Sequence, residues 1–197
     1  MTKDSGVTNL LTRSLEEHLQ ALKTLLESGL DDVASSGRVI CDALAAGNKI
    51  LLCGNGGSAA DAQHIAAELV GRYEDQRRAY PAIALTTDTS ALTALSNDFG
   101  FEEVFARQVQ ALAKPGDVLI AISTSGKSPN VVKAAETARS LGCKIIGLTG
   151  RHAEPLADYC FITVQVMSER TARVQEGHIT IGHLWCEMVD EILGKEG

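Results

Sequence analysis

The chain has 197 residues, of which 45% are hydrophobic and 4% aromatic, and its 25 acidic and 18 basic side chains give a formal net charge of -7. A chain of this length usually forms one domain with an ordinary hydrophobic core. The acidic balance argues against nonspecific nucleic-acid binding and against docking on an anionic membrane, because both need clustered lysine and arginine. A negatively charged small substrate stays possible, since loop amides and helix ends bind phosphate without net positive charge.

The compartment follows from the N-terminus and the cysteines. Residues 1–11 are polar and mixed in charge, so no secretory signal is predicted, and no segment approaches the roughly 20 apolar residues that span a bilayer. The five cysteines are widely spaced and never form a C-x-x-C pair, which favours buried free thiols over disulfides or a cysteine zinc site. We therefore expect a cytoplasmic protein.

Two helices are expected first. Leucines at positions 11, 15, 19, 22 and 26 form a helical stripe over Asn9–Glu27, and a second helical stretch, Leu30–Ala46, stops at Gly47. Short apolar runs then alternate with stretches of helical period, which is typical of a parallel sheet covered on both faces. The predicted strands are Ile50–Cys53, Ala82–Leu85, Val118–Ile122, Ile145–Leu148 and Phe161–Val166. The predicted helices that follow them are Ala60–Arg72, Ser90–Ala111 with a break near Gly100, Asn130–Leu141 and Ala172–Leu193, with a weak turn at Pro155–Asp158. The sequence thus predicts an α/β fold, a five-stranded doubly wound parallel sheet led by an N-terminal helical pair, as one domain over residues 1–197.

Two strand ends carry loops that suit a phosphate. The first loop reads Gly54-Asn55-Gly56-Gly57-Ser58, and its glycines let the backbone approach a ligand while Ser58 is expected to cap the next helix. The second reads Ser123-Thr124-Ser125-Gly126-Lys127-Ser128 and offers four hydroxyls and one lysine at a helix start. Either loop alone is equally compatible with a tight, well-capped turn. Their occurrence at two central strand ends favours a ligand site, and the lack of a Walker or dinucleotide pattern favours a sugar phosphate.

A second group of polar residues lies on two predicted helices. His64 and Glu68 stand four residues apart and share a helix face, so they suit a divalent metal or an acid and base pair. The last helix carries Gln175, Glu176, His178 and His183. Gln175 and His183 diverge by roughly 80° and about 12 Å of helix rise, so a site using both is expected to take one from a neighbouring subunit. Two alternatives stay open: a solvated His64–Glu68 surface pair, and core or interface roles for His178 and His183.

Together these motifs resemble the sugar isomerase (SIS) family, and within it the phosphoheptose isomerases. The matching segments are Gly54–Ser58 with Asp61, His64 and Glu68; Gly71–Tyr73; Tyr80–Ala84; Asn97–Gly100; Gly116–Leu119; Ser123–Gly126 with Ser128; and Gln175-Glu176 with His178 and His183. The resemblance implies a flavodoxin-like strand order, with residues 1–47 packing in an oligomer and 48–197 forming the α/β core. It also implies a homotetramer with active sites between subunits. The implied reaction converts sedoheptulose 7-phosphate into D-glycero-D-manno-heptose 7-phosphate, the first step toward nucleotide-activated heptose for lipopolysaccharide core and other surface polysaccharide.

The resemblance also implies a role for each site residue. The phosphate would be held by Ser123, Thr124, Ser125 and Ser128. The sugar would be contacted by Asn55, Gly56, Gly57, Ser58, Glu68, Asn97, Asp98 and Gln175. One zinc ion per subunit would be bound by His64, Glu68, Gln175 and His183. Glu68 would be the base that moves a proton between C1 and C2 through an enediol, and His183 the acid that exchanges a proton with the carbonyl oxygen.

Two other functions are compatible with the same resemblance. One is a non-catalytic SIS-fold tetramer that binds the bacterial replication initiator, and the other is a regulatory domain that senses a sugar phosphate. The presence of Glu68, Gln175 and His183 favours the enzyme, because a binding protein needs no base at the position of Glu68. The absence of a DNA-binding segment in the sequence counts against the regulator.

Overall fold

The computed structural model describes residues 3–194, so the ends of the predicted domain, residues 1–2 and 195–197, lie outside the described part. Five parallel strands form one sheet in the order β2-β1-β3-β4-β5, which is the flavodoxin-like order. The strands are β1 (Ile50–Cys53), β2 (Ala82–Ala84), β3 (Val118–Ser123), β4 (Lys144–Thr149) and β5 (Ile162–Gln165). The predicted doubly wound parallel sheet is confirmed, with its five strands where the apolar runs placed them.

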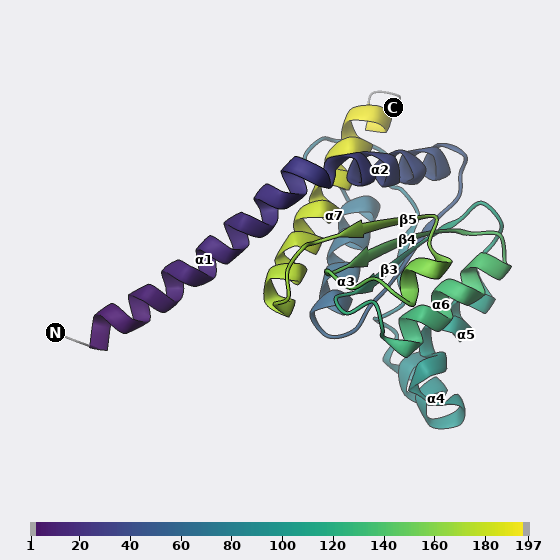
Figure 1. Ribbon diagram of the computed structural model, residues 1–197. Coiled ribbons are helices and arrows are strands. Elements are labelled where there is room, and N and C mark those ends of the chain that lie inside the picture. The colour runs from purple at the N-terminus through teal and green to yellow at the C-terminus, as the bar shows by residue number, and fades with distance from the viewer. Residues whose placement is uncertain (1–2, 195–197) are drawn as a thin grey trace.

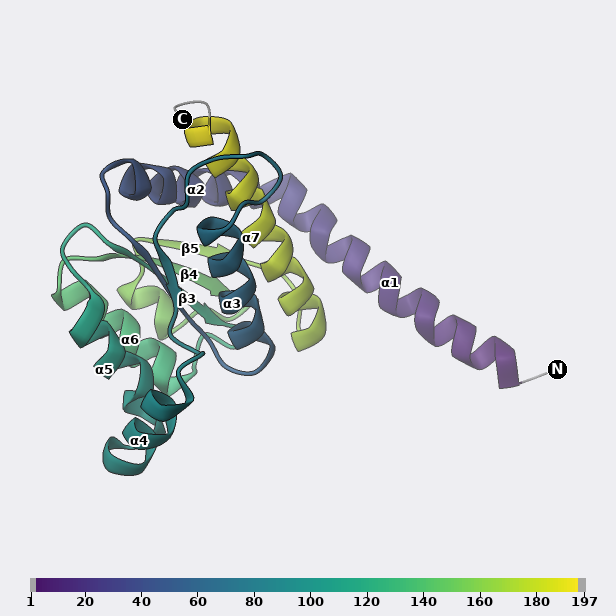
Figure 2. The same cartoon turned by 180° about the vertical axis from the view of Figure 1, so that it is seen from behind.

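Seven α-helices and two short 3-10 turns accompany the strands in the described residues. The helices are α1 (Lys3–Ser28), α2 (Leu30–Ala45), α3 (Gly57–Val70), α4 (Thr89–Phe99), α5 (Val104–Leu112), α6 (Pro129–Ser140) and α7 (Thr171–Leu193); the turns are η1 (Phe101–Glu103) and η2 (Leu156–Tyr159). Helices α2, α3 and α7 cover one face of the sheet and α5 and α6 the other (Figure 1, Figure 2). The predicted break near Gly100 separates α4 from η1, and Gly100 has a φ of 91°. Among the described residues, no helix is both long and apolar enough to cross a membrane.

The central strands β1, β3 and β4 are mostly apolar because both faces of the sheet are covered there. In β1, Ile50 and Leu52 point into the core shared with α2, α3 and α7, whereas Leu51 and Cys53 point into the core shared with α5 and α6. Ile50 is the register partner of both Ala82 in β2 and Val118 in β3. The strand order therefore reverses between β1 and β3. Open α/β sheets bind ligands at the carboxyl ends of the strands on either side of such a reversal.

The helix after β1 begins earlier than expected, and the prediction that Ser58 caps it is wrong. Gly56 occupies the N-cap position with φ 56° and ψ -120°, so α3 starts at Gly57 and not at Ala60. Ser58 consequently lies buried in the first helical turn. The positive φ of Gly56 accounts for the difference, because it turns the chain directly into the helix at low steric cost.

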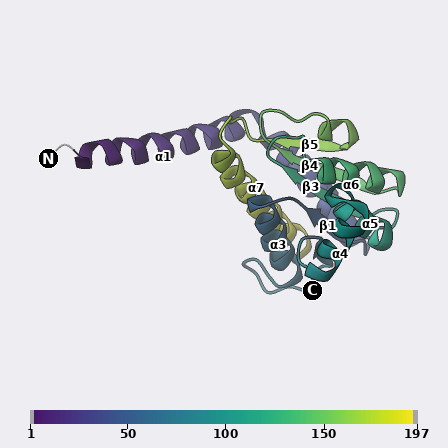
Figure 3. The same ribbon diagram turned by 90° about the horizontal axis from the view of Figure 1, so that it is seen from below.

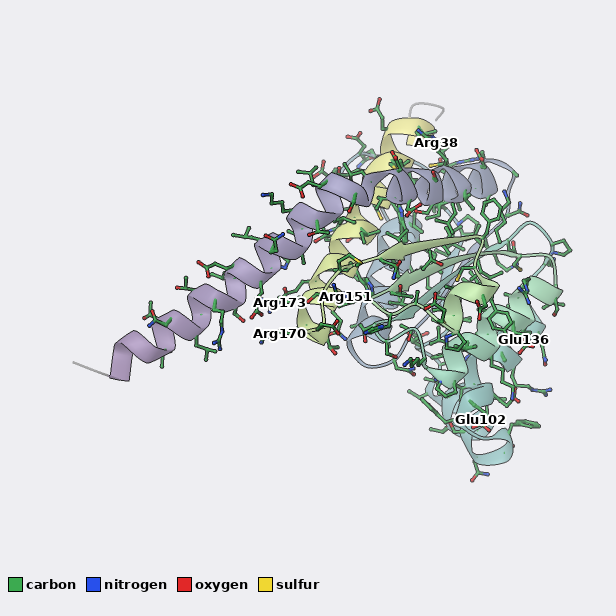
Figure 4. All side chains as sticks on the ribbon, in the orientation of Figure 1. Arg38, Glu102, Glu136, Arg151, Arg170 and Arg173 are labelled. Atoms are coloured by element: carbon green, nitrogen blue, oxygen red, sulfur yellow. The ribbon has the colours of Figure 1, made fainter. Side chains whose placement is uncertain are left out.

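Helix α1 extends away from the rest of the chain (Figure 1, Figure 3). Ala21 and Leu25, in its C-terminal half, are buried, whereas Leu15 and Leu19 are each 64% exposed. Polar contacts join the middle of α1 to α7: Arg173 Nη1 donates to the Ser14 carbonyl at 2.5 Å, Arg170 forms an ion pair with Glu17, and His18 Nδ1 lies 2.8 Å from Glu176 Oε2. Figure 4 shows both arginines at the start of α7. The exposed leucines of α1 therefore form an apolar surface that nothing within residues 3–194 covers.

Candidate active site

The two predicted phosphate loops lie at the carboxyl ends of neighbouring strands and are joined by a pair of amides. Asn55 follows β1, and Asn130 is the second residue of α6, after the serine loop. Each side chain donates to the other at 2.9 Å, and Asn130 is buried. Two reciprocal hydrogen bonds fix the relative position of the loops, so both face the same volume at the edge of the sheet.

The hydroxyls of the second loop gather at the start of α6. Ser123 Oγ donates to Ser128 Oγ at 3.0 Å, and the Lys127 amide donates to Ser125 Oγ at 3.2 Å. Gly126 has a φ of 67°, and a Cβ there would meet the Ala153 backbone at 2.6 Å. The serine loop therefore has one compact shape that sets its hydroxyls beside a helix N-terminus, where an anion is favoured.

The interpretation of these loops as well-capped turns is not supported. Neither Gly56 before α3 nor Ser128 before α6 provides a side-chain cap hydrogen bond. The Ser128 hydroxyl instead accepts from Ser123, on the side of the loop. Neither helix start thus has a side-chain cap, and backbone carbonyls accept from amides such as those of Ser58, Ala59 and Val131.

A cavity of about 250 Å³ lies between the two loops. Its walls are Asn55, Phe101, Glu102, Ser128, Pro129 and Asn130. A neighbouring cavity of about 140 Å³ shares Asn55 and Phe101 with it. The sequence interpretation missed Phe101, Glu102 and Asn130, although Phe101 and Glu102 directly follow the matching segment Asn97–Gly100. Their proximity to the serine loop results from η1 packing against α6, which no local pattern indicates.

Asn97 and Asp98, the predicted sugar contacts, form no hydrogen bond with the serine loop in the described residues. Both are exposed at the C-terminal end of α4, and Asn97 donates to Asp98 at 2.8 Å. Among the described residues, neither side chain forms a hydrogen bond with Ser123–Ser128. The expected sugar contact of this pair stays a prediction.

The second group of polar residues converges where α3 and α7 lie side by side (Figure 1, Figure 3). His64 Nε2 lies 3.1 Å from Glu68 Oε1 and 3.4 Å from His183 Nε2. The two imidazole rings meet edge to face with their centroids 5.0 Å apart, and the Tyr73 ring lies 5.4 Å from that of His183. Tyr73 belongs to the Gly71–Tyr73 match, but sequence reasoning assigned it no role. Three of the four predicted metal ligands thus form one cluster.

Gln175, the fourth predicted ligand, lies on α7 and packs against the beginning of α3, away from His64. A Cβ at Gly57 would be 2.5 Å from Gln175 Nε2, so this amide packs against the first residue of α3. His183 packs against His64, seven residues further along the same helix. The two helices run in the same direction, and Gln175 and His183 are separated along them, as the helical spacing predicts.

Two titratable groups near the cluster have shifted pKa values. His178 is fully buried, and burial lowers its pKa to about 4 although Nε2 donates to the Thr149 carbonyl at 3.0 Å. This neutral ring joins α7 to β4, so the core interpretation holds for His178. Burial raises the pKa of Asp61 to about 6, and His64 partly opposes that shift. Among the described residues, no group hydrogen-bonds the buried Oδ2 of Asp61.

Comparison with known proteins identifies the family. The model of the SIS domain matches residues 15–150. The phosphoheptose isomerase of Aquifex aeolicus is 58% identical over 155 residues, which are 79% of this chain and 81% of the relative. That of Nitratiruptor sp. is 52% identical over 181 residues, which are 92% of this chain and 97% of the relative. The chain belongs to the phosphoheptose isomerases.

Solved structures of phosphoheptose isomerases share the fold described above. The phosphoheptose isomerase GmhA from Neisseria gonorrhoeae is 40% identical with a TM-score of 0.89, and the match covers 94% of this chain and all of that one. The phosphoheptose isomerase from Francisella tularensis is 35% identical with a TM-score of 0.91, and the match covers 94% and 98% of the two chains. The resemblance stated from the sequence motifs is therefore confirmed over nearly the whole chain.

Proposed function

We propose that this phosphoheptose isomerase converts sedoheptulose 7-phosphate into D-glycero-D-manno-heptose 7-phosphate, the first step toward nucleotide-activated heptose. The observation that carries this proposal is the convergence of His64 and Glu68, on α3, with His183, on α7. Helix α3 begins at the glycine loop. A heptulose 7-phosphate carries its phosphate and its reacting carbons at opposite ends, so an anion site and a proton-transfer site must be separated. Seven residues of α3, about 10 Å of helix rise, separate Gly57 from His64.

Glu68 and His183 have the chemistry that the reaction needs. Interconversion of a ketose and an aldose moves a proton between C1 and C2, and a carboxylate such as Glu68 can take it from one carbon and return it to the other. The carbonyl oxygen exchanges a proton as the enediol forms and collapses, and the imidazole of His183 can donate and accept that proton. The serine loop would hold the phosphate end still while these transfers take place.

We also propose one zinc ion per subunit, held by His64, Glu68, Gln175 and His183. No group of three or more His, Cys, Asp or Glu side chains within residues 3–194 forms a site that could hold a metal ion unaided. The donor chemistry nevertheless fits, because the 3.4 Å between the two imidazole Nε2 atoms is about the separation of two ligands on one tetrahedral zinc. Gln175 lies too far along α7 to join them easily, which supports its donation from a second subunit. When bound, zinc would supply a Lewis acid for the enediolate oxygen.

A homotetramer with active sites between subunits is the proposed assembly. The exposed leucines of α1 support it, since contiguous apolar surfaces of this kind normally mark interfaces. A further apolar groove of about 420 Å³ between α2 and α7 is lined by residues such as Val33, Leu184 and Met188. The division of the chain into oligomer-packing residues 1–47 and a core of 48–197 within one domain stays a prediction.

The cytoplasm is the proposed location. All five cysteines are free thiols, which suits a reducing compartment. Fractionation of cells with an antibody to the protein, beside cytoplasmic and periplasmic markers, tests this location directly.

The reaction is tested by incubating purified protein with sedoheptulose 7-phosphate and following the aldose phosphate by coupled assay or NMR. We expect turnover by the wild type and a loss of at least about 100-fold in kcat for Glu68→Gln, because general base catalysis contributes that much or more. Glu136→Gln is the matched control, since Glu136 is exposed on α6 (Figure 4). A wild type without turnover overturns the proposed reaction, and a Glu68→Gln variant near the wild-type rate overturns the role of Glu68 as base.

A further inference from the structure

Arg77, in the loop between α3 and β2, holds the end of the helix that carries Glu68. The Arg77 side chain is 1% exposed. Its Nη2 donates to the Glu68 backbone carbonyl at 2.8 Å, and its Nη1 donates to the Leu69 carbonyl at 3.0 Å. Both carbonyls lie in the last turn of α3, where intrahelical donors run out and a cation complements the helix dipole. Arg77 therefore caps α3 at the residue whose carboxylate is the proposed base.

The same guanidinium is bound to α7 through Asp190. Arg77 Nε donates to Asp190 Oδ1 at 2.6 Å, and Asp190 Oδ2 accepts the amides of Glu74 and Asp75 at 3.1 and 3.2 Å. Burial favours the neutral acid, but Arg77 and these two amides hold the pKa of Asp190 below its usual value. The ion pair thus joins the end of α3, the loop after it and the last turns of α7.

This connection lies near both proposed catalytic groups. Glu68 lies on α3, and His183 lies on α7 seven residues before Asp190, so both are within two helical turns of the ion pair. Tyr73, whose ring packs on His183, belongs to the loop whose amides Asp190 binds. A shift of α3 along α7 would therefore move the Glu68 carboxylate relative to the His183 imidazole.

We propose that Arg77 is a positioning residue for proton transfer, which through the Glu68 carbonyl and Asp190 holds the base on α3 in register with the acid on α7. The proposal rests on the roles given above to Glu68 and His183. Misplacement of a catalytic group by about 1 Å can cost roughly 100-fold in rate. Lysine cannot replace Arg77, because a single ammonium cannot donate to Asp190 and to two carbonyls with the geometry of a guanidinium fork.

A second buried ion pair, between Lys49 and Asp117, provides a matched control. Asp117, which precedes β3, accepts from Lys49 Nζ at 2.5 Å and from the amides of Lys49 and Lys114 at 3.0 and 2.7 Å. Like Asp190, it is a buried carboxylate with one cation and two backbone donors. Its partners, Lys49 and Lys114, lie outside α3 and α7, the helices that carry Glu68 and His183. Asp117→Asn and Asp190→Asn are therefore the same chemical change in two similar settings.

The experiment compares Arg77→Lys, Asp190→Asn and Asp117→Asn in steady-state kinetics with sedoheptulose 7-phosphate, with rates normalised to folded protein. We expect Arg77→Lys and Asp190→Asn to lower kcat by about 10–100-fold with KM within about twofold, because the hydrogen bonds of both side chains in the described structure go to α3, α7 and the loop after α3. Asp117→Asn is expected to lower the unfolding midpoint but to keep kcat within about twofold. Equal losses of kcat in Asp190→Asn and Asp117→Asn, or an unchanged kcat in Asp190→Asn, would overturn the proposal.

A readout that does not depend on turnover separates this proposal from the reaction itself. The imidazole signals of His64 and His183 in NMR spectra of chelator-treated protein should move in Arg77→Lys and Asp190→Asn and stay in place in Asp117→Asn. If Glu68→Gln proves active while these signals move as expected, the base assignment fails and the structural connection stands. If the signals stay in place in Asp190→Asn, the positioning role fails whatever the fate of Glu68. Asp190→Asn carries both tests if Arg77→Lys does not fold.

Discussion

His64 and His183 stand 119 positions apart in the chain, and their Nε2 atoms face each other at 3.4 Å. Two imidazole nitrogens gain from such an approach when a proton or a cation lies between them. Glu68 lies beside the pair, its Oε1 3.1 Å from His64 Nε2. The arrangement is one that a shared cation would stabilise.

Removal of one imidazole should therefore abolish tight zinc binding. We expect His64→Gln to weaken zinc binding by more than the roughly 10–100-fold that loss of an outer-shell partner costs. Competition with a chromophoric chelator, together with the metal content of the purified protein, measures the change. The control is His152→Gln, because His152 is exposed in the turn after β4 and takes no part in the cluster. Equal zinc affinity in the two variants would contradict the proposed site.

The hydroxyls of Ser123 and Ser125 should contribute to substrate affinity more than to the chemical step. We expect Ser123→Ala with Ser125→Ala to raise KM roughly 10–100-fold, since a hydrogen bond to a charged group contributes about 1.5–3 kcal/mol. Steady-state kinetics, with inorganic phosphate as a competitive inhibitor, measures this effect. Ser140→Ala is the control, because Ser140 is exposed at the other end of α6 and donates only to the Thr137 carbonyl. An unchanged KM in the double variant would show that the phosphate binds elsewhere.

His178 should make the protein less stable in acid. Burial holds its folded pKa at about 4, against the ordinary value of 6.5, so between these values the unfolded chain binds a proton that the folded chain does not. The free energy of unfolding therefore falls as the pH drops from about 6.5 towards 4. The loss from this group amounts to roughly 3 kcal/mol when the pH has passed through the whole window.

Guanidinium unfolding at pH 7, 6 and 5, at one protein concentration, tests this pH dependence. We expect His178→Gln to lose less stability between pH 7 and pH 5 than the wild type, although it is less stable at pH 7 because its fit in the core is poorer. The exposed His152→Gln serves as the control and should keep the wild-type slope. The same slope in wild type and His178→Gln would contradict a neutral, buried ring.

The exposed face of α1 should hold subunits together. We expect Leu15→Ser with Leu19→Ser to shift the protein from tetramers to smaller species at micromolar concentration and to lower its activity, because sites between subunits would be broken. Light scattering after size-exclusion chromatography measures the mass. The matched control, Glu16→Gln, changes an exposed polar residue of the same helix. A double variant that keeps the wild-type mass would exclude this face from the assembly.

Local patterns were sufficient for most of the fold. Largely apolar runs predicted all five strands, and the central strands have few polar positions because they are buried on both faces, as Ile50–Cys53 illustrates. The spacing of His64 and Glu68 predicted a shared face, since the helix repeat alone determines it. The role of Ser58 was predicted wrongly because α3 begins early, at the positive φ of Gly56. Any of the glycines in this loop can adopt such a φ, so the sequence does not show which one does.

The sequence by itself thus determined the sheet, the order of its elements, the glycine-rich and serine-rich loops and the family of the protein, because these depend on local periodicity and on motifs that are read along the chain. Only the tertiary structure decided which distant residues meet. Asn130 with Asn55, Phe101 with the serine loop, and Arg77 with Asp190 and the Glu68 carbonyl come together through helix packing. Such contacts depend on the sum of many apolar interactions across the sheet, and no short stretch of sequence contains them.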